Sequence, residues 1–292
     1  MEVSTLALVD VKYNTAYHLS TQQTAVQSND SDETRVDLYL EQLQRDRDRL
    51  PAQVHHLVAD GYYSKTKFIN GVAELGLFQI GKLRHDASLR WLYQGHQKPR
   101  GRPKLYDGKV LFTDLTRFES VGEKNGMMFY TAVVNSPCFQ RNLRIVYVLK
   151  PQGKHLHTAL LFSTDLLLSA ADIYRFYKAR FQIEFLFRDA KQFTGWTDCQ
   201  SRQQHVLDFH LNASMTALNL IKLKDRSQTP LQSTRLHPIS IASWKIRNSH
   251  EYLLQRFSFH LALDFNAIKS SSIFQYLCNY STISSSTSST PY

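Results

Sequence analysis

The chain has 292 residues, of which 42% are apolar and 12% aromatic, and it carries a net charge of +10 at pH 7. This composition excludes a disordered chain and supports one large domain or two smaller ones, each with a packed core. Charged residues at Glu2, Asp10 and Lys12 argue against a signal peptide, and no apolar run approaches the roughly 18 residues of a membrane helix, so we expect a cytoplasmic protein without a membrane partner.

The first predicted elements are a β-hairpin and a helix. Apolar runs at Ser4–Val9 and Thr15–Leu19 flank a polar turn, as the two strands of a hairpin do. Asp32 can cap a helix that runs to about Leu50 and is ended by Pro51. The chain is therefore expected to open with strand, strand and helix.

A strand that ends in an aspartate is the first candidate for a functional site. Val54–Ala59 is a short apolar run, followed by Asp60, Gly61 and a predicted helix over residues 64–75. This order places Asp60 at the carboxyl end of a central strand, where open α/β sheets hold their sites. An aspartate that closes a turn or caps a helix is the alternative.

A basic, β-rich insertion is predicted after the next strand, residues 77–83. Three alternating runs, 127–135, 142–150 and 156–162, are typical of antiparallel strands. Residues 81–110 contain eight Lys or Arg against two Asp, so +6 of the net +10 lies within thirty residues. Charge concentrated in this way indicates a nucleic-acid partner more strongly than a basic average does.

Residues 173–191 are predicted to form one helix with an unusual face. At about 100° per residue, Tyr177, Arg180, Glu184 and Lys191 fall within a stripe of about 60° between aromatic flanks. A solvated face with charge pairs four residues apart would explain the charges alone. The aromatic flanks instead favour a crevice, where one carboxylate among cations suits a metal or phosphate site.

The order of elements is typical of a ribonuclease H-like core: a hairpin, a helix, a strand ending in aspartate and a helix bearing glutamate. In such a core, carboxylates from different elements converge on two divalent ions about 4 Å apart. Asp60 and Glu184 are the candidates, and oxygen ligands favour Mg²⁺ or Mn²⁺ over zinc. The predicted fold class is α/β, with a ribonuclease H-like mixed sheet, helices on both faces, a β-rich insertion and a helical C-terminal extension.

Tyr177, Arg180, Glu184 and Lys191 are separated by two, three and six residues. This spacing is the signature of the DDE transposases of bacterial insertion sequences, in the branch called insertion sequence four, which the chain resembles. The segment VADGYYSK, which contains Asp60, resembles the block around the family's second catalytic aspartate. The segment GRPKLYDGK looks like part of the family's insertion region.

The resemblance implies cut-and-paste DNA transposition, in which water and then a DNA 3′-hydroxyl attack phosphodiesters. It implies that Asp60 and Glu184 are catalytic metal ligands, and that Tyr177, Arg180 and Lys191 hold DNA phosphates or an extruded base. Double-stranded DNA, as transposon ends and as target, is the implied partner. The joining of two ends implies a homodimer on the DNA, in the bacterial cytoplasm.

The family's third carboxylate has no clear counterpart. It should end the first strand of a three-strand meander, whereas two predicted strands precede the first helix here. Asp10, in the predicted hairpin turn, is the nearby candidate. We therefore expect a truncated or separately encoded C-terminal part of a transposase, deficient in catalysis alone. The alternatives are a non-catalytic DNA-binding remnant that inhibits an intact transposase, and a ribonuclease H-like repair or restriction nuclease.

The stretch Pro99–Lys104, PRGRPK, is a second candidate DNA contact. It matches the core of an AT-hook, a flexible Arg-Gly-Arg-Pro segment that lies in the narrow minor groove of A·T-rich DNA. As part of a folded insertion, Arg100, Arg102 and Lys104 would instead contact phosphates. Both alternatives are DNA contacts.

Two histidine pairs are expected to be structural. His55 and His56 are neighbours, so on a strand they point to opposite faces. His155 and His157 share a face but have no Cys or carboxylate partner in the predicted insertion.

The predicted organisation has five parts. They are the first part of the catalytic core (1–83), the basic β-rich insertion (84–158), the rest of the core with the glutamate-bearing helix (159–224), a helical extension (225–280) and a disordered tail (281–292).

Overall fold

The computed structural model describes residues 2–24, 34–153, 155–228 and 240–282. The chain divides into two compact units. Residues 24–181 form one, which we call the sheet unit, and residues 1–23 with 182–292 form the other, which we call the hairpin unit. Both units contain strands and helices, so the predicted α/β class is confirmed.

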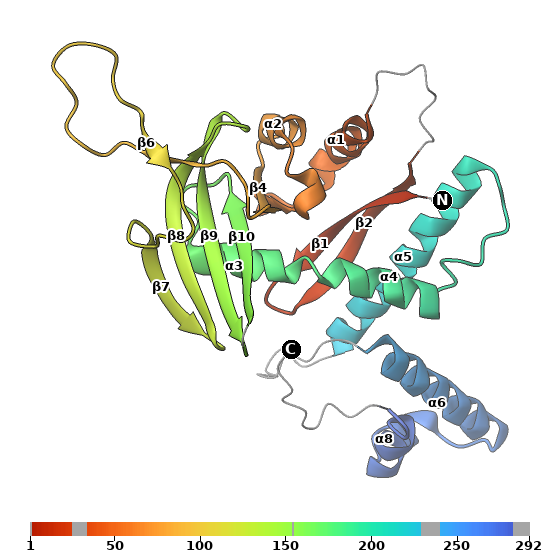
Figure 1. Cartoon of the computed structure of the whole chain (residues 1–292). Coiled ribbons are helices and arrows are strands. Elements are labelled where there is room, and N and C mark those ends of the chain that lie inside the picture. The colour runs from red at the N-terminus through yellow and green to blue at the C-terminus, as the bar shows by residue number, and fades with distance from the viewer. Residues whose placement is uncertain (1, 25–33, 154, 229–239, 283–292) are drawn as a thin grey trace. The chain divides into compact units, whose positions relative to one another are not determined.

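The sheet unit is organised around one eight-stranded mixed sheet (Figure 1). Its strands are β3 (His56–Val58), β4 (Phe78–Leu83), β5 (Arg90–Leu92), β6 (Tyr106–Lys109), β7 (Glu119–Lys124), β8 (Met127–Ser136), β9 (Arg141–Gln152) and β10 (His155–Ser163). The strand order is β3-β4-β10-β9-β8-β5-β6, and β7 pairs with β8. β3 and β4 are parallel, whereas the other neighbours are antiparallel.

The three alternating runs predicted between residues 127 and 162 form β8, β9 and β10. Asn125 and Gly126 join β7 to β8, and both have positive φ, 52° and 70°. A two-residue hairpin turn of this kind needs positive φ at both central positions, which Asn-Gly provides. β10 also pairs with β4, so these strands continue the sheet that begins at β3. The predicted borders of the insertion stay a prediction.

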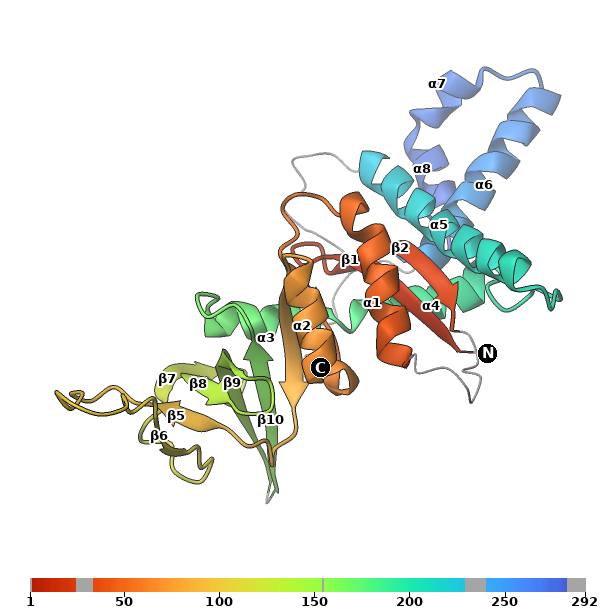
Figure 2. The same ribbon diagram turned by 90° about the horizontal axis from the view of Figure 1, so that it is seen from above.

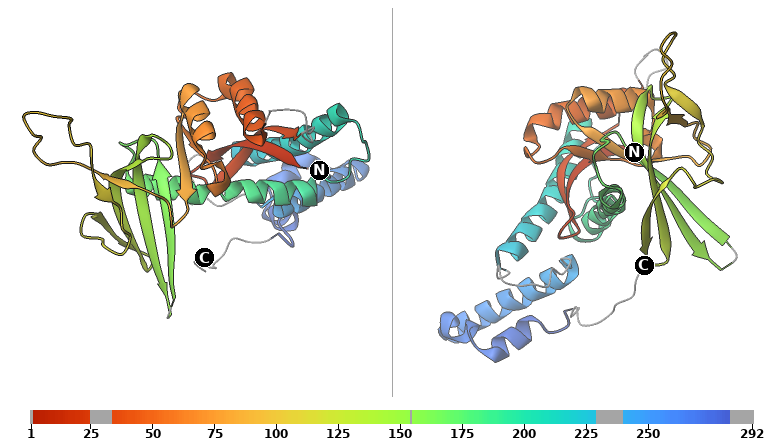
Figure 3. Two further views of the ribbon diagram at one scale, coloured as in Figure 1. Left: turned by 45° about the horizontal axis from the view of Figure 1, so that its top comes forward. Right: turned by 90° about the vertical axis from the view of Figure 1, so that its left-hand side faces the viewer.

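Helices cover both faces of this sheet. They are α1 (Arg35–Asp46), α2 (Thr66–Glu74) and α3 (Ala170–Ala179). Ile69 of α2 packs in a cluster with Phe162 of β10, whereas Ile173 of α3 packs with Leu161. Successive side chains of a strand point to opposite faces, so α2 and α3 lie on opposite sides. Figure 3 shows α3 crossing its face of the sheet.

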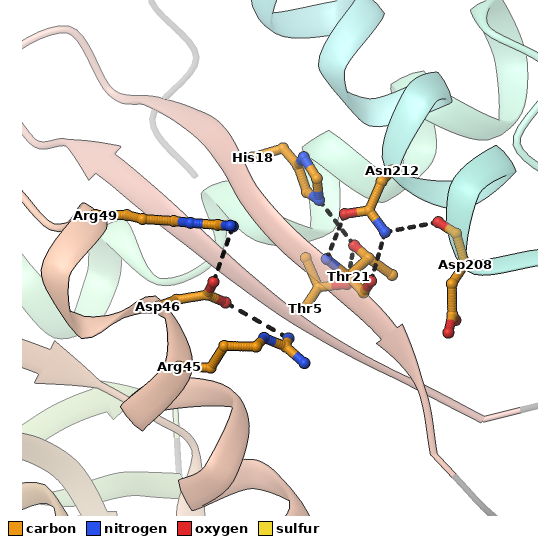
Figure 4. Close-up of polar contacts among 8 residues, drawn as sticks. All are labelled: Thr5, His18, Thr21, Arg45, Asp46, Arg49, Asp208 and Asn212. Atoms are coloured by element: carbon orange, nitrogen blue, oxygen red, sulfur yellow. Dashed lines mark hydrogen bonds and ion pairs between the residues drawn. The ribbon is translucent and has the colours of Figure 1, made fainter. Parts of the chain in front are cut away.

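α1 lies beside α2 (Figures 1 and 2) and begins with a capping box formed by Thr34 and Asp37. The predicted cap, Asp32, lies outside the described residues. At the other end of α1, Asp46 is fully buried, with Oδ1 3.1 Å from Arg49 Nη1 and Oδ2 3.8 Å from Arg45 Nη2 (Figure 4). Burial of this carboxylate is tolerated because it is paired.

In its described residues, the hairpin unit combines a two-stranded sheet with five helices. Its elements are β1 (Val3–Asp10), β2 (Thr15–Gln23), α4 (Gln182–Phe193), α5 (Gln204–Gln228), α6 (Ile241–His260), α7 (Phe265–Lys269) and α8 (Ser272–Cys278). β1 and β2 are antiparallel, as predicted, with a bulge between Leu6 and Ala7. Leu186 of α4 and Met215 of α5 are fully buried in the core beneath this hairpin.

α6, α7 and α8 lie within the predicted helical extension 225–280 (Figure 2). Residues 229–239 of that extension and residues 283–292 of the predicted tail lie outside the described residues. Among the helices that are described, none has both the length and the apolar character needed to cross a membrane.

Candidate active site

Asp60 lies two residues beyond β3 and caps the short 3₁₀ turn Gly61–Tyr63. Its Oδ1 accepts a hydrogen bond of 2.9 Å from the backbone N–H of Tyr62. The chain reaches this point along the sheet, because Ala59 N–H donates to the carbonyl of Ile80 at 3.0 Å. The side chain is exposed, and its Oδ2 has no hydrogen bond to a described residue. Asp60 is thus a turn cap that keeps one carboxylate oxygen available.

The prediction that Asp60 ends a central strand is wrong for the described sheet. β3 is the first strand in the order and pairs with β4 on one side. The physical reason is that the backbone of β3 pairs with β4 alone among the described strands of the sheet unit. Asp60 therefore follows an edge strand.

Tyr177 and Arg180, both from the end of α3, belong to the same unit as Asp60. Val58 of β3 and Tyr177 pack against the same buried cluster around Ile173. Burial raises the pKa of the Tyr177 phenol, Arg180 opposes the rise, and the carboxylate of Asp60 adds to it. The guanidinium carbon of Arg180 lies 5.8 Å from the centroid of the Tyr177 ring. Asp60 belongs to the same unit as these two residues.

The predicted helix over residues 173–191 is two helices. α3 ends at Ala179 and α4 begins at Gln182. Between them, Arg180 N–H donates to the carbonyl of Tyr177 at 3.3 Å and Phe181 N–H donates to that of Lys178 at 3.3 Å. These three-residue hydrogen bonds tighten the last turn and end the α-helical ladder. The stripe predicted on one helix is therefore divided, and the boundary between the two units falls at the same point.

Glu184 and Lys191 lie on α4, in the hairpin unit. Glu184 is exposed in the first turn of α4, where a negative charge is favourable beside the helix N-terminus. Lys191 is exposed in the last turn, with Nζ 5.6 Å from the centroid of the Trp196 ring. Both side chains are accessible to a ligand.

A second charged group of the hairpin unit was missed by the sequence analysis. Asp189 and Lys222 are 7% and 5% exposed, respectively. Lys222 Nζ donates to the carbonyl of Ala16 at 2.7 Å, and Arg188 Nη2 donates to Asp189 Oδ1 at 2.8 Å. Burial lowers the pKa of Lys222 from 10.5 to about 8, and Asp189 opposes the change. These residues line a cavity of about 250 Å³ with Phe185.

The sequence contained a signal for this group. Asp189 follows Leu186 by three residues and precedes Phe193 by four, so it occupies an apolar position of its helix. Lys222 follows Leu218 by four residues on the inner face of α5. A charged residue at an apolar position of a helix predicts a buried, partnered charge.

The basic stretch lies on the loop between β5 and β6. Arg100 and Arg102 are exposed and have no hydrogen bond or ion pair within the described part of the chain. Lys104 differs from them, because its Nζ donates to Asp107 Oδ1 at 2.7 Å. The three residues predicted as one group thus differ in their contacts.

Asp10 and His56 have structural contacts. Asp10 Oδ1 accepts from the backbone N–H groups of Lys12 at 2.9 Å and Tyr13 at 3.0 Å, which closes the turn between β1 and β2. His56 Nε2 lies 3.0 Å from Asp165 Oδ2. The His56 ring also lies against Phe78 and Phe176, with centroid distances of 5.7 Å and 5.6 Å.

The chemistry of Asp60 and Glu184 fits a hard divalent cation. Both present exposed carboxylate oxygens, the ligands that Mg²⁺ and Mn²⁺ prefer. Mg²⁺ is often held by one or two carboxylates, with waters and substrate phosphates completing its shell. Within the residues described, no three His, Cys, Asp or Glu side chains are grouped as the ligands of a metal ion would be.

Comparison with known proteins identifies the family. The model of the family described as "Transposase DDE domain" matches residues 8–220, from the end of β1 into α5. A search of curated proteins finds no match. Because the family model spans most of the chain, the protein belongs to the transposase DDE domain family.

Proposed function

We propose that this chain acts in cut-and-paste DNA transposition, as a transposase of the insertion sequence four branch with a ribonuclease H-like core. The observation that carries the proposal is that Val58, at the end of β3 before Asp60, and Tyr177 pack against one buried cluster, with Arg180 over the Tyr177 ring. Glu184 and Lys191 follow Arg180 at the spacing of the family signature. One carboxylate, one phenol and one guanidinium at a strand end suit a phosphodiester substrate.

Asp60 and Glu184 are the proposed metal-holding residues. Each offers an exposed carboxylate, and Asp60 keeps Oδ2 available while Oδ1 accepts from Tyr62 N–H. Two divalent ions, Mg²⁺ or Mn²⁺, would supply Lewis-acid activation of the attacking oxygen and stabilisation of the leaving oxygen. The turn that Asp60 caps fixes the direction of its carboxylate before an ion binds.

The cationic residues of the signature are proposed to hold DNA. Arg180 would contact a phosphate through its guanidinium, and Tyr177 would donate a hydrogen bond from its phenol, whose raised pKa further favours the neutral form. Lys191 would contact a second phosphate. Arg100 and Arg102 would add contacts away from the reacting bond, with Lys104 beside them. Two DNA ends are joined in transposition, so we propose a homodimer on the DNA.

The third carboxylate is the open part of the mechanism. Asp10 lies in the hairpin near which the third carboxylate is expected, but its Oδ1 already accepts two backbone hydrogen bonds that close the turn. We propose that the third carboxylate comes from another polypeptide segment, and that this chain alone is deficient in catalysis. The same observation favours the second candidate function, a non-catalytic DNA-binding remnant that inhibits an intact transposase by mixed assembly.

The test is cleavage and joining of the DNA that borders the gene, with Mg²⁺. We expect no reaction from the chain alone, and Mg²⁺-dependent cleavage and joining once a segment that carries the third carboxylate is supplied. Asp60→Asn and Glu184→Gln should abolish that activity. Activity of the chain alone that is lost in Asp10→Ala would overturn the proposal on the third carboxylate. Cleavage of any duplex without joining would indicate a nuclease, and inhibition of an intact transposase without activity of the supplemented chain would indicate the remnant.

A further inference from the structure

We propose that the loop between β5 and β6, residues 93–105, is a minor-groove arm that inserts Arg100 and Arg102 into A·T-rich duplex DNA. We call this loop the basic arm. Figure 1 shows it projecting beyond the sheet before β6. The inference rests on the proposed function, because it assumes that the chain binds DNA, and it adds the kind of groove and sequence that the arm would recognise.

The base of the basic arm is held by hydrogen bonds between its two limbs. Tyr93 N–H donates to the carbonyl of Leu105 at 2.9 Å. The Gln97 side-chain amide makes two hydrogen bonds to the backbone of Lys104. Its Nε2 donates to the Lys104 carbonyl at 2.8 Å, and its Oε1 accepts from the Lys104 N–H at 3.0 Å. The two limbs are therefore joined up to residues 97 and 104, and residues 98–103 form the tip.

The root of the basic arm is fixed to the sheet. Arg90 Nη2 donates to Asn135 Oδ1 at 2.7 Å, and the Arg90 guanidinium carbon lies 3.7 Å from the centroid of the Tyr106 ring. Arg117 Nη2 lies 3.2 Å from Asp107 Oδ2, and the Arg117 guanidinium lies over the ring of Trp91 at 4.6 Å. Cations near the root are thus used in internal contacts, which fix the direction of the arm.

Lys104 also belongs to the base of the arm. Its Nζ donates to Asp107 Oδ1 at 2.7 Å and lies 4.5 Å from the centroid of the Tyr93 ring. An ammonium held by a carboxylate and an aromatic ring is less available to a phosphate. Lys104 is therefore a positioning residue, and the DNA contact is assigned to Arg100 and Arg102.

The tip has a backbone suited to a narrow groove. Pro99 and Pro103 each fix their own φ and favour an extended conformation at the residue before them. Gly101, between the two arginines, has a φ of +101°, and a Cβ added there would meet nothing within 4 Å. Glycine is thus needed for the backbone conformation and not for space inside the protein. The result is a thin turn with an arginine on each side.

Arg100 and Arg102 are accessible charges of this arm, as is Lys98. Both arginines are exposed, and neither has a hydrogen bond or ion pair within the described part of the chain. The minor groove is about 6 Å wide, which admits an extended chain but no helix. A·T-rich tracts narrow it further and deepen its negative potential, which attracts arginine. Arginine is less strongly hydrated than lysine, so it enters such a groove at a lower desolvation cost.

The experiment measures binding of the purified full chain to two fluorescent duplexes of equal length, one A·T-rich and one G·C-rich. Arg100→Lys/Arg102→Lys keeps the charge, and Gly101→Ala keeps both arginines but disfavours the backbone of the tip. Lys124→Ala/Lys150→Ala is the control, because it removes two exposed charges from outside the arm. Thermal unfolding of every variant checks that the fold is retained.

We expect the wild type to prefer the A·T-rich duplex by roughly tenfold. Arg100→Lys/Arg102→Lys and Gly101→Ala should lose this preference while keeping affinity for the G·C-rich duplex. Lys124→Ala/Lys150→Ala should weaken binding to both duplexes equally. A small minor-groove ligand should displace the wild-type protein from the A·T-rich duplex and not from the G·C-rich one. Equal affinity of the wild type for the two duplexes, or a preference retained in Arg100→Lys/Arg102→Lys, would overturn the proposed minor-groove insertion but not the proposal that the chain binds DNA. Absence of binding to either duplex at low salt would overturn the proposed function itself.

Discussion

Asn212 of α5 makes the hydrogen bonds to Thr21 of β2 that a neighbouring strand would make. Its Oδ1 accepts from Thr21 N–H at 2.9 Å and its Nδ2 donates to the Thr21 carbonyl at 2.6 Å (Figure 4). Asn219 forms the same pair with His18, at 2.9 Å and 2.7 Å. Seven residues of helix rise about 10.5 Å and three residues of strand about 10 Å, so the two asparagines match the strand. The helix thereby seals a strand edge that would otherwise be open to other chains.

Asn212→Ala should lower the free energy of unfolding by about 2 to 4 kcal/mol, because it leaves a backbone N–H and a carbonyl of β2 without partners. Urea unfolding measures the change. Thr216→Ala, on the exposed face of the same helix, is the control and should change stability by less than about 0.5 kcal/mol. Equal effects of the two substitutions would show that the asparagine does not hold the strand edge.

Lys222 should make stability rise with pH in alkaline solution. Folded Lys222 releases its proton near pH 8, whereas the unfolded side chain does so near its ordinary pKa of 10.5. Between these values the unfolded chain binds more protons, so the free energy of unfolding increases with pH, by up to about 3 kcal/mol. Lys222→Met removes this dependence. Urea unfolding of both proteins below pH 8 and near pH 10.5 checks the difference, and parallel pH profiles would contradict it.

The phenol of Tyr177 should report on Asp60 without any DNA. Asp60→Asn removes a negative charge that disfavours the phenolate, so the pKa of Tyr177 should fall; Arg180→Gln should raise it. The ultraviolet absorbance of phenolate, measured against pH with Tyr177→Phe as the blank, gives the titration of this residue. Asp86→Asn is the control, because that exposed carboxylate is paired with Arg84. An unchanged pKa of Tyr177 in Asp60→Asn would show that the charge of Asp60 does not act on the Tyr177 phenol.

Gly81→Ala should destabilise the sheet unit by about 1 to 3 kcal/mol. Gly81 of β4 pairs directly with Phe162 of β10, and a Cβ at residue 81 would lie 2.7 Å from Phe162 Cε1. Phe162 is fully buried, so its ring has little room to move. A double-mutant cycle with Phe162→Leu should show that the two substitutions are less than additive, and strict additivity would contradict this contact.

The strands of this protein were largely predictable from the sequence. Alternation of apolar residues marked β8, β9 and β10. Tight turns and period-two patterns are local, so one sequence suffices to predict them. The hairpin of β1 and β2 was predictable for the same reason.

The division of the predicted helix 173–191 into α3 and α4 and the edge position of β3 were not predictable in this way. Residues 173–191 contain neither Gly nor Pro, so no local signal marks the end of α3 at Ala179. Which strands pair with β3 depends on contacts far apart in sequence. The signature spacing nevertheless selected Tyr177 and Arg180, which lie with Asp60 in the sheet unit.

The most direct test of the central claim is Mn²⁺ binding, measured by electron paramagnetic resonance with nicked duplex DNA present. The account predicts that Asp60→Asn and Glu184→Gln each weaken Mn²⁺ binding by about tenfold or more. Asp198→Asn, an exposed carboxylate beyond α4, is the control and should bind as the wild type does. Wild-type affinity for Mn²⁺ in both Asp60→Asn and Glu184→Gln would contradict the claim that these two carboxylates hold the catalytic metal.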